Sequence, residues 1–209
     1  MMKKLFLALC LAIPSLASCE PAKKMDPDAK SPAEVPEVPA GAEVVSLGSG
    51  CFWCIEAAYD QLDGIYSATS GYMGGAVKNP TYEMVSGGDS GHAEVVRVVF
   101  DPKKITYEKV LAWFWDLHDP TTMNRQGNDV GTQYRSAIFY QTDEQKRISE
   151  ASKQAAQKNF DEPIVTEITK ASEFYPAEKY HQAYYMQNKS AGYCKYVIEP
   201  KLKKLKLDH

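Results

Sequence analysis

The stretch at residues 48–56, Gly-Ser-Gly-Cys-Phe-Trp-Cys-Ile-Glu, places the strongest local constraint on the fold. An apolar, β-branched run at residues 42–47 ends at its glycines, and an amphipathic segment follows at residues 55–62. This pattern predicts a strand, a glycine turn and a helix. Cys51 then lies at the helix N-terminus, where unpaired N–H groups and the helix dipole favour a thiolate over a thiol. We therefore expect an ionised, reactive Cys51, and the alternative is that Cys51 and Cys54 are small buried apolar residues.

Two aromatic residues, Phe52 and Trp53, follow the cysteine directly. Adjacent side chains at a helix start point in different directions, so both rings cannot enter the core. At least one ring should therefore line a surface pocket beside Cys51.

The first 18 residues have the form of an export signal. A basic start at residues 1–4 precedes an apolar run at residues 5–17, which is too short and too soon broken by Pro14 to span a bilayer. The sequence Leu-Ala-Ser-Cys at residues 16–19 resembles the bacterial lipoprotein cleavage box, in which Cys19 would be lipidated and become the new N-terminus. An ordinary secretory signal cut after a small residue is the alternative. We predict an exported, membrane-anchored bacterial lipoprotein on the periplasmic or another extracytoplasmic face of a membrane.

Residues 19–41 are rich in proline, alanine and charged residues, which predicts a disordered tether. Residues 42–209 then form one folded domain, in which Cys51, Cys54 and Cys194 are the remaining thiols. Because three is an odd number, the thiols of an exported domain cannot all be used in structural disulfides within it. The net charge of −3 gives no electrostatic footprint for nucleic acid.

Strands and helices alternate irregularly along the domain, which predicts an α+β fold, a small mixed sheet with helices packed on it. The predicted strands are 93–100, 135–140 and 164–168, and the predicted helices are 106–118, 142–160 and 176–188. We expect a loop at the glycine-rich residues 64–75 and a long polar loop at residues 119–134.

Five motifs, in collinear order over about residues 44–204, resemble those of the A-class peptide methionine sulfoxide reductases, which act on the S epimer. The motifs are Gly-Cys-Phe-Trp at 50–53, Gly-His-Ala-Glu-Val-Val at 91–96, His-Asp-Pro-Thr-Thr at 118–122, the run from Asn124 to Ser136, and Tyr-His-Gln at 180–182. One short match would mean little, but several long ones in order leave little room for chance. The resemblance implies a two-layer, ferredoxin-like core with long functional loops.

The resemblance also assigns roles to site residues. It implies that Cys51 is the nucleophile and that Phe52 and Trp53 form the pocket for the substrate methyl group. Three side chains, supported by Asp129, would bind the sulfoxide oxygen: Glu94, Tyr82 and Tyr134.

The chemistry of a sulfoxide agrees with this assignment. Its sulfur carries an apolar methyl group and a strongly accepting oxygen, so its site needs an aromatic cage beside convergent donors. The oxygen must gain protons before sulfur can be attacked. Glu94, at the start of a valine-rich strand, could supply them as a carboxylic acid kept neutral by burial. An exposed Glu94 and simply packed tyrosines are the alternatives.

After the reaction Cys51 would be a sulfenic acid, which condenses with a second thiol. The family commonly uses a cysteine in a C-terminal Gly-Tyr-Cys segment, which Cys194 matches, and we favour Cys194 because a mobile tail could reach Cys51. Cys54, one helical turn from Cys51, is the alternative, and a relay through both is a third. Regeneration then needs an external dithiol of thioredoxin type. We expect a monomer with no bound cofactor and no metal, since a thiolate held by zinc could not attack.

Two other functions fit parts of the sequence. The Cys-x-x-Cys pair could belong to a thiol-disulfide oxidoreductase, although such domains need neither Glu94 nor the loop at residues 119–134. A lipid-anchored module that binds oxidised proteins without turnover is the other. Insulin reduction without sulfoxide reduction would favour the first, and stoichiometric binding without free methionine would favour the second.

Overall fold

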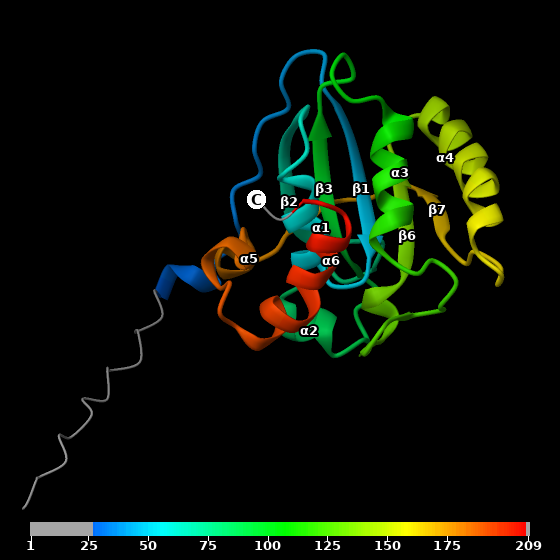
Figure 1. Cartoon of the computed structure of the whole chain (residues 1–209). Coiled ribbons are helices and arrows are strands. Elements are labelled where there is room, and N and C mark those ends of the chain that lie inside the picture. The colour runs from blue at the N-terminus through cyan, green and yellow to red at the C-terminus, as the bar shows by residue number, and fades with distance from the viewer. Residues whose placement is uncertain (1–26, 208–209) are drawn as a thin grey trace, which may run out of the picture.

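A mixed sheet forms the centre of residues 27–207, the part of the chain that the computed structural model describes (Figure 1). Its strands are β1 (Glu43–Ser49), β2 (Ile65–Met73), β3 (Ala93–Phe100), β6 (Ser136–Tyr140), β7 (Glu167–Lys170) and β8 (Tyr175–Pro176). The six strands have the order β7-β6-β1-β3-β2-β8, and all neighbours are antiparallel except β6 and β7. The predicted export signal and Cys19 lie outside the described residues.

The helices that follow β1 and β3 give the sheet its topology. They are α1 (Phe52–Tyr59) and α3 (Tyr107–Leu117). The chain order β1, α1, β2, β3, α3, β6 combines with the spatial order β6-β1-β3-β2 to form a ferredoxin-like βαββαβ core. The predicted α+β fold with a small mixed sheet is therefore confirmed.

Helices cover one face of the sheet. Figure 1 shows α1, α3 and α6 (Glu199–Lys204) in front of the strands, with α4 (Asp143–Ala156) beside α3. Between them, these elements and the sheet bury one continuous apolar cluster, which includes Phe52, Phe114 and Leu202. The cysteine turn thus lies at the junction of the sheet and its helical layer.

Two threonines cap the long helices, which begin where the sequence predicts. The Thr106 hydroxyl accepts the N–H of Lys109, and the Thr142 hydroxyl accepts the N–H of Gln145. The Gln145 side chain in turn accepts the N–H of Gln141, just before the cap. These bonds satisfy first-turn donors that no backbone carbonyl can reach.

The prediction of a loop at residues 64–75 is wrong, because residues 65–73 form β2. Its glycines suggested a turn, but Gly71 is small for a different reason. A Cβ on Gly71 would lie 2.4 Å from Cζ of Phe174, whose ring packs on this strand from the segment that leads to β8. The positive φ of Gly74 (+87°) follows the end of the strand. Contact across the sheet, which the local sequence does not reveal, therefore explains Gly71.

The predicted helix at residues 176–188 is also wrong. This segment contains a short 3-10 helix at Lys179–His181 and a single helical turn, α5 (Tyr184–Gln187). Between them Ala183 has a φ of +48°, which interrupts a helix. The Gln182 side chain bonds the N–H and C=O of Ser70, so tertiary hydrogen bonds replace helical ones.

Smaller differences concern element ends and the long loop. The predicted strand at 164–168 is found at β7, and the helix predicted to reach residue 160 becomes a 3-10 turn after Ala156. The loop at residues 119–134 holds a hairpin of β4 (Arg125–Gln126) and β5 (Asp129–Val130). A Cβ on Gly50 would lie 2.7 Å from Gln126, so the hairpin packs closely on the cysteine turn.

The C-terminal segment is helical and packed, in contrast to the expected mobile tail. A π-helical turn at Cys194–Ile198 leads into α6. Ile198 and Leu202 are fully buried in the core that also contains α1. Apolar residues spaced along this segment therefore anchor it over the cysteine turn.

The described part of the predicted tether is not free of the domain. Residues 28–33, which we call the N-terminal strap, lie against residues 177–179, and Figure 1 shows this blue segment beside the orange α5 region. Ala33 N–H donates to the Ala177 carbonyl and Lys179 N–H donates to that of Ser31. Residues 28–33 of the expected tether are therefore held against the domain. Among residues 27–207, no helix is long and apolar enough to cross a membrane.

Candidate active site

Cys51 occupies the N-cap of α1, at the end of the turn that leaves β1. Gly50 has a φ of +89°, which a residue with a side chain rarely adopts, and it brings the chain sharply from strand to helix. Cys51 is 9% exposed and lines two adjoining cavities. The predicted strand, turn and helix are confirmed, and Cys51, although largely buried, borders both cavities.

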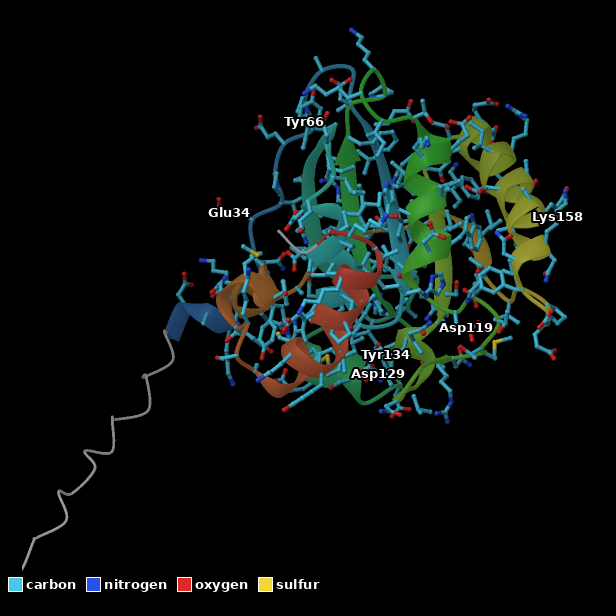
Figure 2. The ribbon with its side chains drawn as sticks, viewed as in Figure 1. Glu34, Tyr66, Asp119, Asp129, Tyr134 and Lys158 are labelled. Carbon is cyan, nitrogen blue, oxygen red and sulfur yellow. The ribbon has the colours of Figure 1, made fainter. Side chains whose placement is uncertain are left out.

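The smaller cavity, of about 230 Å³, is lined by most of the predicted site residues, and we call it the catalytic cavity. Its lining residues are Cys51, Phe52, Trp53, Tyr82, Glu94, Asp129, Tyr134 and Tyr193. Figure 2 shows Asp129 and Tyr134 close together at the end of the molecule that holds α2 (Tyr82–Ser86). The fold therefore gathers residues from five separate segments around one sulfur.

Glu94 is the buried acid of this cavity. It is 1% exposed, and its Oε2 accepts the N–H of Phe52 at 3.1 Å. Burial raises the pKa of Glu94 to about 8, and the carboxylate of Asp129 adds to this effect while the Phe52 N–H opposes it. The carboxyl is therefore mostly neutral at pH 7 and can donate a proton. This geometry excludes the exposed alternative for Glu94.

The expected ionisation of Cys51 is wrong for the free protein. Burial, the adjacent Cys54 and Glu94 raise the pKa of the Cys51 thiol well above its ordinary value. Cys51 makes no capping hydrogen bond to the helix, and the first N–H of the helix, that of Phe52, donates to Glu94. The helix N-terminus thus stabilises the carboxyl group and not the sulfur.

Cys54 lies about one helical turn after Cys51, and both residues line the second of the two cavities. A hydrogen bond from the Cys51 thiol lowers the pKa of the Cys54 thiol, and the charge of Lys201 adds to this shift. The cavity has a volume of about 500 Å³ and lies between the β4–β5 hairpin and the C-terminal helices. Both thiols are therefore accessible from a cleft that does not include Glu94.

The aromatic wall is held by Tyr184 and His181, to which the sequence analysis assigned no role. Trp53 stacks on Tyr184 with ring centroids 3.8 Å apart and an interplanar angle of 9°. Its Nε1–H donates to Nδ1 of His181 at 3.1 Å. Burial lowers the pKa of His181 to about 4, so this imidazole is neutral and can accept. Both Phe52 and Trp53 line the cavity, which confirms that at least one ring borders a pocket.

The polar side of the cavity carries two tyrosines and an acid. Burial raises the pKa of Tyr82 to about 12 and raises that of Tyr134 as well, so both hydroxyls stay protonated and can donate. The Tyr193 hydroxyl, which was not predicted, donates to Oδ2 of Asp129 at 2.6 Å. Its position one residue before Cys194 was the only sequence signal that could have pointed to Tyr193.

Cys194 lies apart from these cavities. It is fully buried and lines neither of the two that Cys51 borders. Burial raises the pKa of Cys194. A bond between Cys194 and Cys51 therefore requires a change in the C-terminal segment.

A larger cavity, of about 760 Å³, lies near the start of β1, at the other end of that strand from Cys51. It is bordered by residues such as Glu43, Arg97 and Thr106 and contains no cysteine. Volume alone would have selected this cavity, but the nucleophile and the neutral acid are elsewhere.

A cysteine that borders a cavity beside a second thiol, a neutral carboxylic acid and an aromatic wall defines a cysteine-dependent oxidoreductase site. The family model described as peptide methionine sulfoxide reductase matches residues 43–209. This chain therefore belongs to the peptide methionine sulfoxide reductase family and is an enzyme that reduces methionine sulfoxide by thiol chemistry.

Individual relatives agree with the family match. A peptide methionine sulfoxide reductase MsrA of Leptospira borgpetersenii is 54% identical over 162 residues, 78% of this chain and 92% of the relative. An MsrA of Sulfolobus acidocaldarius is 51% identical over 78% of this chain and 92% of its own length.

Solved structures show the same fold. Reduced Mxr1 from Saccharomyces cerevisiae has a TM-score of 0.71 and 36% identity over 75% of this chain and 91% of its own. Methionine sulfoxide reductase A of Corynebacterium diphtheriae has a TM-score of 0.67 and 32% identity, covering 84% and 95% of the two chains. Mxr1 in complex with Trx2 has a TM-score of 0.53 and 27% identity, covering 72% of this chain and 89% of its own.

Proposed function

We propose that the enzyme reduces the S epimer of methionine sulfoxide, free or in exported proteins, with Cys51 as nucleophile and Glu94 as proton donor. The observation that carries this proposal is the shared cavity in which the Cys51 thiol faces a buried carboxyl with a pKa of about 8. A sulfoxide is a poor electrophile until its oxygen is protonated, so a neutral acid beside the sulfur is the essential group.

Phe52 and Trp53 take the substrate methyl group, and the hydroxyls of Tyr82 and Tyr134 donate to the sulfoxide oxygen. Asp129 supports this arrangement. The Asp129 carboxylate accepts a hydrogen bond from the Tyr193 hydroxyl, which fixes the orientation of the carboxylate. The aromatic side of the cavity excludes water from the methyl group, while the polar side stabilises charge that develops on oxygen.

Binding of the substrate activates Cys51. Proton donation from Glu94 to the sulfoxide oxygen leaves positive charge on the substrate sulfur, and this charge lowers the pKa of the adjacent thiol. The Cys51 sulfur then bonds to the substrate sulfur while the thiol proton passes to the Glu94 carboxylate and restores the neutral acid. The hydroxyl then moves from the substrate sulfur to the Cys51 sulfur as the bond between the two sulfurs breaks, which releases methionine and leaves a Cys51 sulfenic acid.

Cys54 is the first partner of the sulfenic acid in this proposal. Its contact with Cys51 and its lowered pKa support this assignment, whereas Cys194 is buried away from both cavities. Condensation forms the Cys51–Cys54 disulfide and releases water. Cys194, which we favoured from the sequence, would enter in a second exchange after the C-terminal segment moves.

An external dithiol of thioredoxin type then reduces the disulfide and is itself oxidised to a disulfide. The relative whose structure is described as Mxr1 in complex with Trx2 supports this class of reductant. The export signal, with Cys19 as the lipidated residue, would place the reductant and the substrates on the extracytoplasmic side of a membrane.

The test is peptide mapping after one equivalent of a peptide that contains methionine S-sulfoxide, without reductant. We expect one methionine for each enzyme and a new Cys51–Cys54 disulfide, and Cys51→Ser abolishes both. Cys194→Ser is the matched control and should leave this first turnover intact. Methionine formed by Cys51→Ser would contradict the role of Cys51, and a Cys51–Cys194 bond in the first turnover would contradict that of Cys54.

A further inference from the structure

Glu178 is a buried carboxylate that the proposed mechanism does not use. It is 7% exposed and lies between the catalytic cavity and the N-terminal strap. Its Oε1 accepts the backbone N–H of Tyr82 at 2.8 Å, and its Oε2 accepts the hydroxyl of Tyr72 at 2.9 Å. Nε2 of His181 lies 3.9 Å from the same Oε2. One carboxylate therefore contacts Tyr82, which lines the cavity, and lies near two residues, Tyr72 and His181, whose rings pack on Phe52.

The contact with Tyr82 is mechanically important because Tyr82 begins α2, a helix of only five residues. A helix of this length has no stability of its own, so its position depends on anchoring bonds at its ends. The bond from Tyr82 N–H to Glu178 is one anchor, and the Thr81 hydroxyl that accepts the N–H of Met84 is another. Moving the first anchor would move the Tyr82 hydroxyl in the cavity.

The contact with Tyr72 reaches the buried acid. Tyr72 is paired directly with Glu94 across β2 and β3, and its ring centroid lies 5.9 Å from that of Phe52. Tyr72 itself does not line the catalytic cavity. Glu178 thus connects the oxygen-binding tyrosine with the strand register that places Glu94.

The N-terminal strap fixes the backbone of Glu178 from outside. Pro32 and Glu178 form an antiparallel bridge, flanked by bonds from Ala33 N–H to Ala177 O at 3.0 Å and from Lys179 N–H to Ser31 O at 2.9 Å. An ion pair joins Asp28 and Lys179. The family match begins at residue 43, so the strap is an addition to the part of the chain that matches the family.

We propose that Glu178 and the N-terminal strap form a clamp that positions Tyr82 for the sulfoxide oxygen. Glu178 is a positioning residue, because it contacts Tyr82 and Tyr72 and does not line the cavity. The clamp rests on the proposed function, since it acts through the Tyr82 hydroxyl. It assigns the segment between the membrane signal and the enzyme domain a second role beyond spacing.

Substitution of Glu178 tests the clamp. Glu178→Ala leaves two buried donors without their acceptor and should lower kcat/KM for a sulfoxide peptide by about tenfold to a hundredfold, as expected for a displaced catalytic group. Glu178→Gln keeps one acceptor oxygen and should recover activity to within about threefold of the unchanged enzyme. The decisive readout is a double-mutant cycle with Tyr82→Phe. If Glu178 acts through the Tyr82 hydroxyl, Glu178→Ala causes no further loss in the Tyr82→Phe enzyme.

The strap is tested with two proline variants of the full chain. Ala33→Pro removes the donor to Ala177 and should lower kcat/KM by about twofold to fivefold, the effect of one hydrogen bond. Val35→Pro is the matched control, since the Val35 N–H makes no backbone hydrogen bond within residues 27–207, and its activity should be unchanged. The loss from Ala33→Pro should disappear in the Glu178→Ala enzyme.

The outcomes separate the clamp from the proposed function. Tyr82→Phe with full activity would contradict the role of Tyr82 itself. A clear loss in Tyr82→Phe, combined with multiplicative losses in the double variant, would overturn the clamp and leave the proposed function standing. Equal losses of activity in Ala33→Pro and Val35→Pro would overturn the proposed role of the strap in positioning Glu178.

Discussion

The neutral state of Glu94 makes a specific prediction about pH. With a pKa of about 8, about nine in ten Glu94 carboxyls are neutral at pH 7, against about one in three hundred for a carboxyl with an ordinary pKa. Burial thus increases the population of the acid about 300-fold at pH 7. At pH 9 only about one Glu94 in ten remains neutral, so the rate of the first turnover should fall about tenfold between pH 7 and pH 9.

Glu94→Gln is the variant that isolates this effect. The amide can still accept the Phe52 N–H but cannot donate a proton that it then loses, so the first-turnover rate should fall by about a hundredfold or more. The small remaining rate should not show the tenfold fall between pH 7 and pH 9, because the group that titrates is gone.

The assay is a single turnover without reductant, in which methionine released from a sulfoxide peptide is measured by chromatography at each pH. Circular dichroism at pH 7 and pH 9 verifies that the enzyme stays folded. A first-turnover rate that rises with pH in the unchanged enzyme would refute the reasoning, because it would mean that thiolate formation and not the acid limits the reaction.

The same substitution has an effect on stability whose sign follows from linkage. Since the folded pKa of Glu94 is raised, its stabilising contribution is complete below the unfolded pKa and is lost as pH rises through about 8. Glu94→Gln should therefore gain about 1 kcal/mol of unfolding free energy relative to the unchanged enzyme between pH 7 and pH 9. Urea unfolding at the two pH values measures this difference, and an unchanged difference would contradict the raised pKa.

Two further predictions concern packing and helix capping. Trp53→Ala removes the ring that stacks on Tyr184. It should raise KM for the sulfoxide peptide about tenfold with a smaller change in kcat, since the ring binds the methyl group about equally in the ground state and the transition state. Steady-state kinetics measure both constants, and an unchanged KM would contradict the methyl pocket. Thr142→Ala removes the cap of α4 and should lower the unfolding free energy by about 1 kcal/mol without a change in kcat/KM. Urea unfolding and activity assays measure the two quantities, and a loss of activity would contradict the separation of α4 from the site.

Local patterns in the sequence were sufficient for the parts of the fold that local forces decide. The turn between β1 and α1, the starts of α3 and α4 and the strand β3 depend on neighbouring residues, and all three were predicted. Elements that depend on distant contacts were not. Gly71 lies in a strand because Phe174 covers it, and residues 176–188 lose their helix to bonds from Gln182 and Glu56.

The site follows the same division. The family resemblance identified the residues that line the catalytic cavity, except for Tyr193. It did not reveal the ionisation of Cys51, which depends on the burial of the thiol and on the adjacent Cys54 and Glu94. It also did not reveal Glu178, because a carboxylate whose partners lie about a hundred positions away along the chain has no local signature.

The most direct test of the account is a single turnover in the Cys54→Ser, Cys194→Ser variant, where Cys51 is the one thiol left in residues 27–207. After one equivalent of sulfoxide peptide, a sulfenic-acid trap and mass spectrometry should find one methionine released for each enzyme and one trapped oxygen on Cys51. Methionine released without a sulfenic acid on Cys51, or no methionine at all from the folded variant, would contradict direct attack by this sulfur.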